Sequence, residues 1–142
     1  MGTISSGPAA PGQAARVGQA ARWTLAVIRV INGGLALLAP GFIIGRFNGP
    51  PSPNGAALYG LRMFGIRTVL LGVDLATLSG EPLRRALREA VIIHATDTAA
   101  VALLGVTGRA KPRTVIPLAL ISLTNTTLAV TACLAQRAER KA

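Results

Sequence analysis

The sequence predicts an all-α integral membrane protein, a four-helix bundle whose two termini both lie in the cytoplasm. Hydrophobic residues make up 51% of the 142 positions, whereas Asp, Glu, Lys and Arg together make up 14%. A soluble domain carries about 25% charged residues, so this chain has too few of them to cover a water-facing surface. The apolar residues also fall into four long runs separated by turn-forming residues, which is the pattern of membrane-spanning helices.

Both ends of the chain differ in composition from the apolar runs. Residues 1–20 are rich in Gly, Ala, Ser and Pro and contain one charged residue, Arg16. Such a segment cannot bury a core, and we expect it to be a disordered tail. The transmembrane domain is expected to cover residues 21–136, and residues 137–142 are expected to form a basic C-terminal tail.

Four membrane spans are predicted, at about residues 23–44, 58–78, 89–107 and 114–136. The fourth span is the clearest, because Arg113 and Arg137 enclose 23 residues without a charge. With a rise of about 1.5 Å per residue, such a helix crosses a hydrocarbon core of roughly 30 Å. The longest connection, residues 46–55, is expected to be non-helical because it contains three prolines and two Asn-Gly pairs.

The distribution of positive charges predicts the orientation in the membrane. Eight Lys and Arg residues lie on the side that holds the N-terminus, the second connection and the C-terminus, against four on the opposite side. Positive residues are enriched in cytoplasmic loops, so both termini are expected in the cytoplasm. Thirteen Arg against two Lys, together with many Ala residues, indicate a GC-rich bacterial genome and therefore the bacterial inner (plasma) membrane.

The most informative feature is a set of polar and ionisable residues inside the predicted spans. A charged side chain at the bilayer centre costs roughly 2.5–3.5 kcal/mol on insertion scales, so these residues are expected to pair or to face a polar cavity. The candidate intramembrane cluster consists of Arg29, Asn32, Arg67, Asp74, His94, Asp97 and Asn125. Arg62 lies near a span end, where its side chain is expected to reach the membrane surface.

The depths of these residues in the spans predict two layers. Arg67 and Asp97 both fall near the midplane, where we expect an ion pair. Arg29, Asp74 and His94 fall together nearer the cytoplasm. Two interpretations stay open: a structural network that fixes the register of the helices, or a polar pocket that binds a headgroup or moves protons.

Glycines in the apolar runs indicate where helices approach each other closely. Gly41 and Gly45 form a GxxxG pattern, but Pro40 precedes it, which favours a frayed span end. Gly65 and Gly72 are the better candidates for a close contact, because glycine lets two helix backbones approach each other.

Several function classes find no support in the sequence. Nucleic-acid binding is not expected despite the net charge of +10, because the positive residues flank the apolar runs and form no basic helix face. His94 and Asp97 have the ligand types and spacing of a metal site, but one His and two Asp beside two Arg make a poor cation cage. No metal or cofactor is therefore expected, and no motif identifies a catalytic residue.

Three stretches carry a family resemblance: Arg29–Phe42 (RVINGGLALLAPGF), Tyr59–Gly72 (YGLRMFGIRTVLLG) and His94–Thr98 (HATDT). Together they resemble an uncharacterised family of small four-span membrane proteins that is common in actinobacteria. The resemblance covers about residues 22–135. It implies a four-helix membrane fold, and it carries over no settled activity and no catalytic residue.

The sequence therefore predicts a small multi-pass membrane protein of non-enzymatic character, either an accessory subunit or a module that binds a lipid or another small ligand. Its expected partners are the lipid bilayer and, in addition, another membrane protein or further copies of the same chain. Two alternatives stay open. One is an intramembrane enzyme with Asp or His acid-base chemistry on a lipid-like substrate, and the other is a small proton-coupled transporter that acts as a homodimer.

Overall fold

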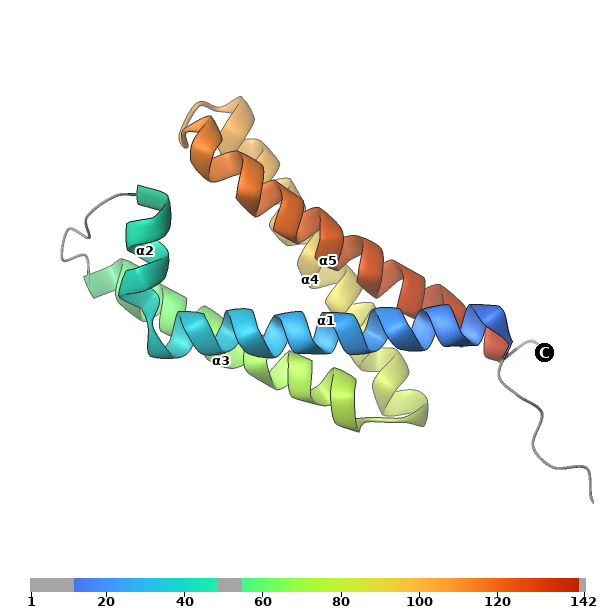
Figure 1. Cartoon of the computed structure of the whole chain (residues 1–142). Helices are drawn as coiled ribbons and strands as arrows, with labels where there is room; N and C mark the ends of the chain where they lie inside the picture. Colours follow the sequence, from blue (N-terminus) through green and yellow to red (C-terminus); the bar gives the residue numbers. More distant parts are fainter. Residues whose placement is uncertain (1–11, 49–54, 141–142) are drawn as a thin grey trace, which may run out of the picture.

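The computed structural model describes residues 12–48 and 55–140, and this part of the chain is helical apart from short turns (Figure 1). Its elements are α1 (Gln13–Leu38), α2 (Pro40–Asn48), α3 (Gly55–Thr77), α4 (Gly80–Val106) and α5 (Pro112–Glu139). Four of these helices, α1, α3, α4 and α5, are long and apolar enough to cross a membrane. The prediction of an all-α chain with four long apolar helices is confirmed for these residues.

Helix α1 begins earlier than the composition indicates. Residues 13–20, expected in the disordered tail, are helical, and Gly18 lies directly against Ala135 of α5. This contact buries Gly18 and stabilises the first part of α1 as a helix. The prediction of disorder is therefore wrong for residues 13–20, whereas residues 1–11 lie outside the described part of the chain.

The first predicted span, residues 23–44, is interrupted at Pro40. Helix α1 ends at Leu38, and Pro40 begins the short helix α2, which turns away from the axis of α1 (Figure 1). A proline inside a helix removes a hydrogen bond and clashes with the preceding turn, which explains the break. Residues 46–48, expected in a non-helical connection, continue α2, and Gly55 begins α3, whereas the residues between them are outside the described part.

Helices α4 and α5 also extend past their predicted ends. Helix α4 begins at Gly80, well before residue 89, because Leu83 and Leu87 in its first turns are fully buried. Helix α5 continues to Glu139, so residues 137–139 of the expected C-terminal tail are helical.

Two helix hairpins make up the fold. Helix α1 packs along α3, α4 packs along α5, and α1 also contacts α5. The hairpins meet near the N-terminus of α1 and the C-terminus of α5 and diverge toward the opposite end (Figure 1). Buried apolar residues such as Leu25, Leu75, Leu83 and Leu87 fill the joined half. The expected four-helix bundle is therefore closed in one half and open in the other.

Glycines bring the backbones of α1 and α3 into direct contact. A Cβ atom at Gly65 would lie 2.6 Å from the Leu37 backbone nitrogen and 2.7 Å from the Gly33 carbonyl oxygen, and one at Gly72 would lie 2.9 Å from the Ala26 carbonyl oxygen. Real Cβ atoms do not come this close to backbone atoms, so no larger residue fits without moving a helix. The expectation of a close helix contact at Gly65 and Gly72 is confirmed.

Arg22 on α1 binds the C-terminal end of α3. Its Nε donates to the carbonyl of Leu75 (2.5 Å), and its Nη2 donates to the carbonyls of Ala76 (3.1 Å) and Leu78 (2.9 Å). The last carbonyls of a helix lack partners within the helix, and a cation near this end is favourable as well. This contact fixes the hairpin of α1 and α3 at its joined end.

The glycine contact generates a stability prediction. Gly33→Ala places a methyl group 2.8 Å from backbone atoms of Gly65 and Val69, and we expect it to lower the free energy of unfolding by about 1–3 kcal/mol. Its neighbour Gly34 has no atom within 4 Å of a built Cβ, so Gly34→Ala is expected to raise that energy by roughly 0.5–1 kcal/mol through the better helix propensity of alanine. Thermal unfolding of both variants in one detergent measures the difference. Equal midpoints for the two variants would contradict a tight contact of α1 and α3.

Candidate functional site

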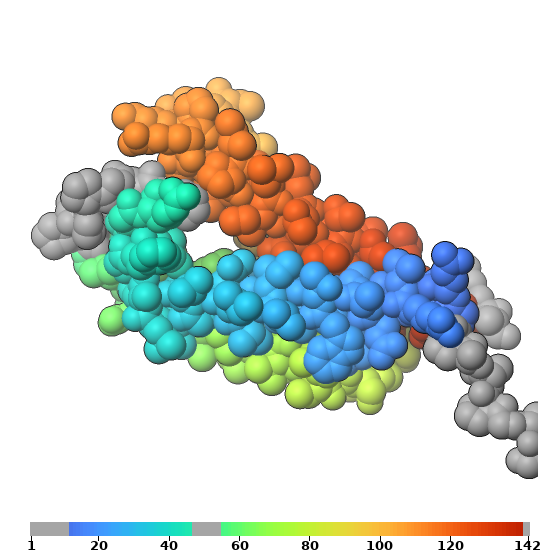
Figure 2. Space-filling view, viewed as in Figure 1, coloured from blue at the N-terminus to red at the C-terminus, as the bar shows by residue number. Residues whose placement is uncertain are grey.

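A cavity lies where the two hairpins separate. Its volume is about 460 Å³, and Figure 2 shows the hollow between α1, α2 and α5. This size falls within the range of about 300–1,000 Å³ that is usual for small-molecule sites. The walls are mainly apolar and are formed by Leu35, Ala36, Phe42, Ile43, Leu61, Phe64, Ala100, Val101, Leu118 and Ile121.

The end of the cavity next to the joined half is polar. Each long helix supplies at least one side chain there, from a position near the middle of the helix: Arg29 and Asn32 from α1, Thr68 from α3, Asp97 from α4, and Ser122 and Asn125 from α5. The divergence of the hairpins explains this arrangement, because the first positions that no longer pack in the core face the cavity. The cavity thus has apolar walls and a polar inner end, and Arg46 of α2 also lines it.

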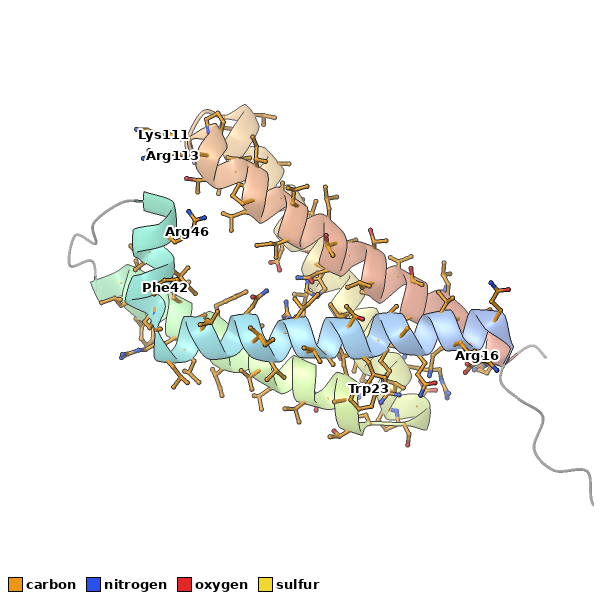
Figure 3. The ribbon with its side chains drawn as sticks, in the orientation of Figure 1. Arg16, Trp23, Phe42, Arg46, Lys111 and Arg113 are labelled. Carbon is orange, nitrogen blue, oxygen red and sulfur yellow. The ribbon has the colours of Figure 1, made fainter. Side chains whose placement is uncertain are left out.

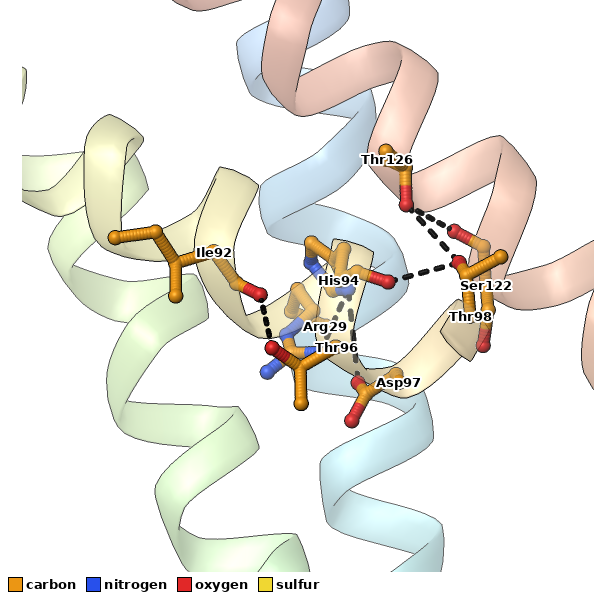
Figure 4. Close-up of polar contacts among 8 residues, drawn as sticks. All are labelled: Arg29, Ile92, His94, Thr96, Asp97, Thr98, Ser122 and Thr126. Carbon is orange, nitrogen blue, oxygen red and sulfur yellow. Dashed lines mark hydrogen bonds and ion pairs between the residues drawn. The ribbon is translucent and has the colours of Figure 1, made fainter. Parts of the chain in front are cut away.

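Arg29, His94 and Asp97 form a connected group at this polar end (Figure 4). Arg29 Nη1 lies 3.5 Å from His94 Nδ1, and Asp97 Oδ2 lies 3.9 Å from the same nitrogen. Because the guanidinium can only donate, His94 Nδ1 is the acceptor, and the neutral ring carries its proton on Nε2. His94 is completely buried, whereas the side chain of Asp97 is 41% exposed and reaches the cavity.

Hydroxyl groups join α4 to α5 beside this group. Thr98 Oγ1 and Thr126 Oγ1 lie 3.2 Å apart, and each also lies 2.8 Å from a carbonyl one turn earlier in its own helix, that of His94 or that of Ser122 (Figure 4). Each hydroxyl has a single proton, so one threonine donates to the other across the two helices while the other donates to its own carbonyl. These bonds fix the rotation of α4 relative to α5. They therefore help to hold His94 and Asp97 on the side of α4 that faces Arg29.

The structure places five of the seven predicted cluster residues together. Arg29, Asn32, Asp97 and Asn125 line the cavity, and His94 lies behind them. The expected proximity of Arg29 and His94 is confirmed. Sequence reasoning missed Thr68, although its spacing from Gly65 and Gly72 places it on the same face of α3 as these glycines.

Arg67 and Asp74 are the two residues that lie elsewhere. Both side chains are exposed on the outer face of α3, and neither has a hydrogen bond or ion pair with any residue in 12–48 or 55–140. The predicted ion pair of Arg67 with Asp97 is therefore wrong, and so is the grouping of Asp74 with Arg29. The physical reason is the rotation of α3, whose buried face is formed by Gly65, Thr68, Leu71, Gly72 and Leu75.

Several buried polar atoms at the site have no hydrogen-bond partner among the described residues. They are Arg29 Nε, Thr68 Oγ1, His94 Nε2 and Asn125 Oδ1. Buried polar groups in proteins almost always have a partner. Three of these four side chains line the cavity, and their unpartnered atoms lie just beneath its surface.

Comparison with known proteins yields no relative. No family model matches the chain, and neither a curated protein nor a solved structure matches it. The resemblance to a four-span actinobacterial family in three motifs therefore stays a prediction. The part of the chain that the structure describes also contains no group of three or more His, Cys, Asp or Glu residues that could hold a metal ion.

The different surroundings of two arginines predict different effects of the same substitution. Arg29→Leu leaves Asp97 without a cation and His94 Nδ1 without its donor, and we expect it to lower the free energy of unfolding by about 1–3 kcal/mol. Arg67→Leu removes an exposed charge that has no ion pair with a described residue, and it is expected not to lower this energy. Thermal unfolding of the two purified variants, compared with the parent chain in one detergent, measures both effects. A larger loss for Arg67→Leu would contradict the placement of the two residues.

Proposed function

We propose that this protein is a membrane-embedded binding module that holds a lipid-like amphiphile in the cavity between its two helix hairpins. The observation that carries the proposal is the combination of apolar walls with a polar end that contains Arg29, Asp97 and Asn125. Ligand sites in proteins typically join an apolar lining with a few converging polar groups. An amphiphile matches both parts, since its chain contacts the walls and its polar group contacts the inner end.

The orientation in the membrane is part of the proposal. The four long helices cross a bacterial inner membrane with both termini in the cytoplasm, as the charge distribution predicts. Arg16 lies at the joined end, and Arg46, Lys111 and Arg113 lie at the open end of the cavity (Figure 3). With this orientation, the cavity opens toward the outer side of the membrane.

Cysteine labelling tests this orientation. Cys133 is the single cysteine of the chain, so Cys133→Ala provides a background for new cysteines. We expect a membrane-impermeant maleimide to label Ala110→Cys, in the connection before α5, on intact bacterial cells. Ala142→Cys at the C-terminus is expected to react only after the cells are permeabilised. The reverse pattern would contradict cytoplasmic termini.

The enzyme alternative has less support in the geometry of the site. Asp97 is the one carboxylate among the residues that line the cavity, and His94 is completely buried behind it. A general acid or base has to reach the substrate directly or through one water molecule. In this alternative Asp97 is the acid or base and Arg29 orients the substrate, while a catalytic role of His94 would require movement of α4.

Filling the cavity tests the binding function. Ala100 lines the cavity, whereas its neighbour Ala99 is exposed and does not. We expect Ala100→Phe to abolish the binding of added dodecanol, dodecanoate or dodecyl phosphate in native mass spectrometry, because the ring occupies the space of the chain. Ala99→Phe, which adds the same ring on the outside, is expected to bind these probes as the parent chain does. Binding that is equal in both variants, or absent from the parent chain, would contradict the proposal.

The second candidate function, an accessory subunit, is favoured by the exposed charges of α3. Arg67 and Asp74 lie within a long apolar helix and face outward. A charge facing lipid near the bilayer centre, the depth predicted for Arg67, costs roughly 2.5–3.5 kcal/mol, so a partner helix with complementary charges would stabilise this face. Two copies of the chain side by side in the same orientation place equal charges at equal depth, which favours a different protein as the partner.

Removal of these charges tests the subunit version. We expect the double variant Arg67→Leu, Asp74→Leu to lose a membrane protein that co-purifies with the parent chain in mild detergent. Arg62→Leu on the same helix removes a charge near the membrane surface and serves as the matched control, with recovery unchanged. If the double variant and the parent chain recover the same protein, or if neither recovers any, this version is excluded.

A further inference from the structure

The polar end of the cavity also indicates which kind of polar group it accepts. We propose that it binds an uncharged group that both donates and accepts hydrogen bonds, such as a hydroxyl or a carboxamide. The ligand is then a neutral long-chain amphiphile whose polar group lies near the middle of the helices and whose chain extends toward the open end. This inference rests on the proposed binding function and specifies its ligand class.

The unpartnered atoms at the polar end are of both kinds. Arg29 Nε is a donor, Asn125 Oδ1 is an acceptor, and the hydroxyl of Thr68 is either. These side chains come from α1, α5 and α3, and their residues are only 4%, 5% and 1% exposed. These atoms lie just beneath the cavity surface, so a ligand group bonds to them when the side chains turn toward it. A group that only accepts would leave Asn125 Oδ1 without a partner, and a group that only donates would leave Arg29 Nε without one. A hydroxyl or a carboxamide satisfies both.

The charges at the polar end balance each other. Arg29 contributes one positive charge and Asp97 one negative charge, and His94 is neutral as the acceptor of the Arg29 hydrogen bond. An anionic group would meet the carboxylate of Asp97, and a cationic group would meet the guanidinium of Arg29. A net-neutral site therefore favours a neutral group over an ion of either sign.

The depth of the site in the helices leads to the same ligand class. Arg29, Thr68, Asp97 and Asn125 all lie near the middle of long apolar helices. An ionised headgroup loses its hydration when it enters the centre of a bilayer, which is far more costly than the transfer of a hydroxyl. A neutral amphiphile reaches this depth from the membrane without that cost.

Basic residues at the open end of the cavity offer an alternative site for the headgroup of the ligand. Arg46 of α2 lines the cavity there, and Lys111 and Arg113 lie at the start of α5 (Figure 3). If these cations hold the ligand, an anionic headgroup binds at the open end and the polar inner end contributes nothing. The two outcomes differ in the headgroup that binds best and in the residues on which binding depends.

A series of probes with one chain length separates these outcomes. The full-length protein in nanodiscs of zwitterionic phospholipid is titrated with dodecanol, dodecanamide, dodecyl phosphate, dodecyltrimethylammonium and dodecane, and bound probe is counted by native mass spectrometry. We expect dodecanol and dodecanamide to bind at least about tenfold more tightly than the two ionic probes and than dodecane. The preference arises because only the two neutral polar probes satisfy donors and acceptors together.

Two variants that preserve side-chain shape identify the residues that form hydrogen bonds with the headgroup. Thr68→Val and Asn125→Leu keep the volume of each side chain and remove its hydrogen-bonding atoms, and each is expected to weaken dodecanol binding about tenfold. Dodecane binding is expected to stay unchanged in both, which also shows that the variants are folded. Thr127→Val on the exposed face of α5 is the control, with dodecanol binding as in the parent chain.

Three results would overturn the inference. Tighter binding of dodecyl phosphate that is lost in Arg46→Gln would place the headgroup at the open end. Equal binding of all five probes would show that the polar end does not discriminate. In both cases the cavity still binds amphiphiles and the proposed function stands, whereas a lack of binding by every probe would overturn the proposed function as well.

Discussion

The direct backbone contact of α1 with α3 determines how the rest of the molecule is arranged. In a membrane, apolar side chains gain little by leaving lipid for a protein interior, so helices associate through close packing and polar contacts. Gly33, Gly65 and Gly72 provide this packing. The hydrogen bond from Arg22 to the Leu75 carbonyl joins α1 to the C-terminal end of α3. The contact sets the rotation of α3 as well as its distance from α1. It turns Thr68 toward the cavity and leaves Arg67 and Asp74 outside.

The same contact positions Arg29. A Cβ atom at Gly72 would lie 3.1 Å from Arg29 Cβ, so the stem of the arginine passes over the surface of α3 at a glycine. Its guanidinium is thereby directed toward α4, where His94 and Asp97 follow each other at a spacing of three residues on one face. The charged group is therefore assembled from two hairpins that are joined next to it. Because the hairpins diverge beyond this point, the group becomes the polar end of a cavity and is not sealed in a core.

Much of the fold could be predicted from the sequence, but the site could be predicted only in part. Long apolar runs identify helices because a span must satisfy all its backbone hydrogen bonds internally, and this argument holds for α3, α4 and α5. The sequence around Pro40 favours a frayed end of one span, whereas in the structure proline starts a new helix, α2. Gly18 is assigned to the tail by composition because its partner, Ala135, is far away in the sequence. Of the predicted cluster, the residues of α1, α4 and α5 come together, and those of α3 do not.

The difference between these helices has a physical cause. From the amino-acid sequence alone follow the number of long apolar helices, the scarcity of surface charge and the approximate depth of each polar residue, because hydropathy and the rise per residue depend on local chain chemistry. The direction in which a residue points around its helix follows from the packing of that helix against others. A helix with apolar residues on all sides carries little information about this direction, so depth alone matched Arg67 with Asp97. The glycine contact of α1 and α3 determines the direction in which the residues of α3 point, and it turns Arg67 away from the cavity. Arg29 therefore faces His94 and Asp97 at the polar end of the cavity.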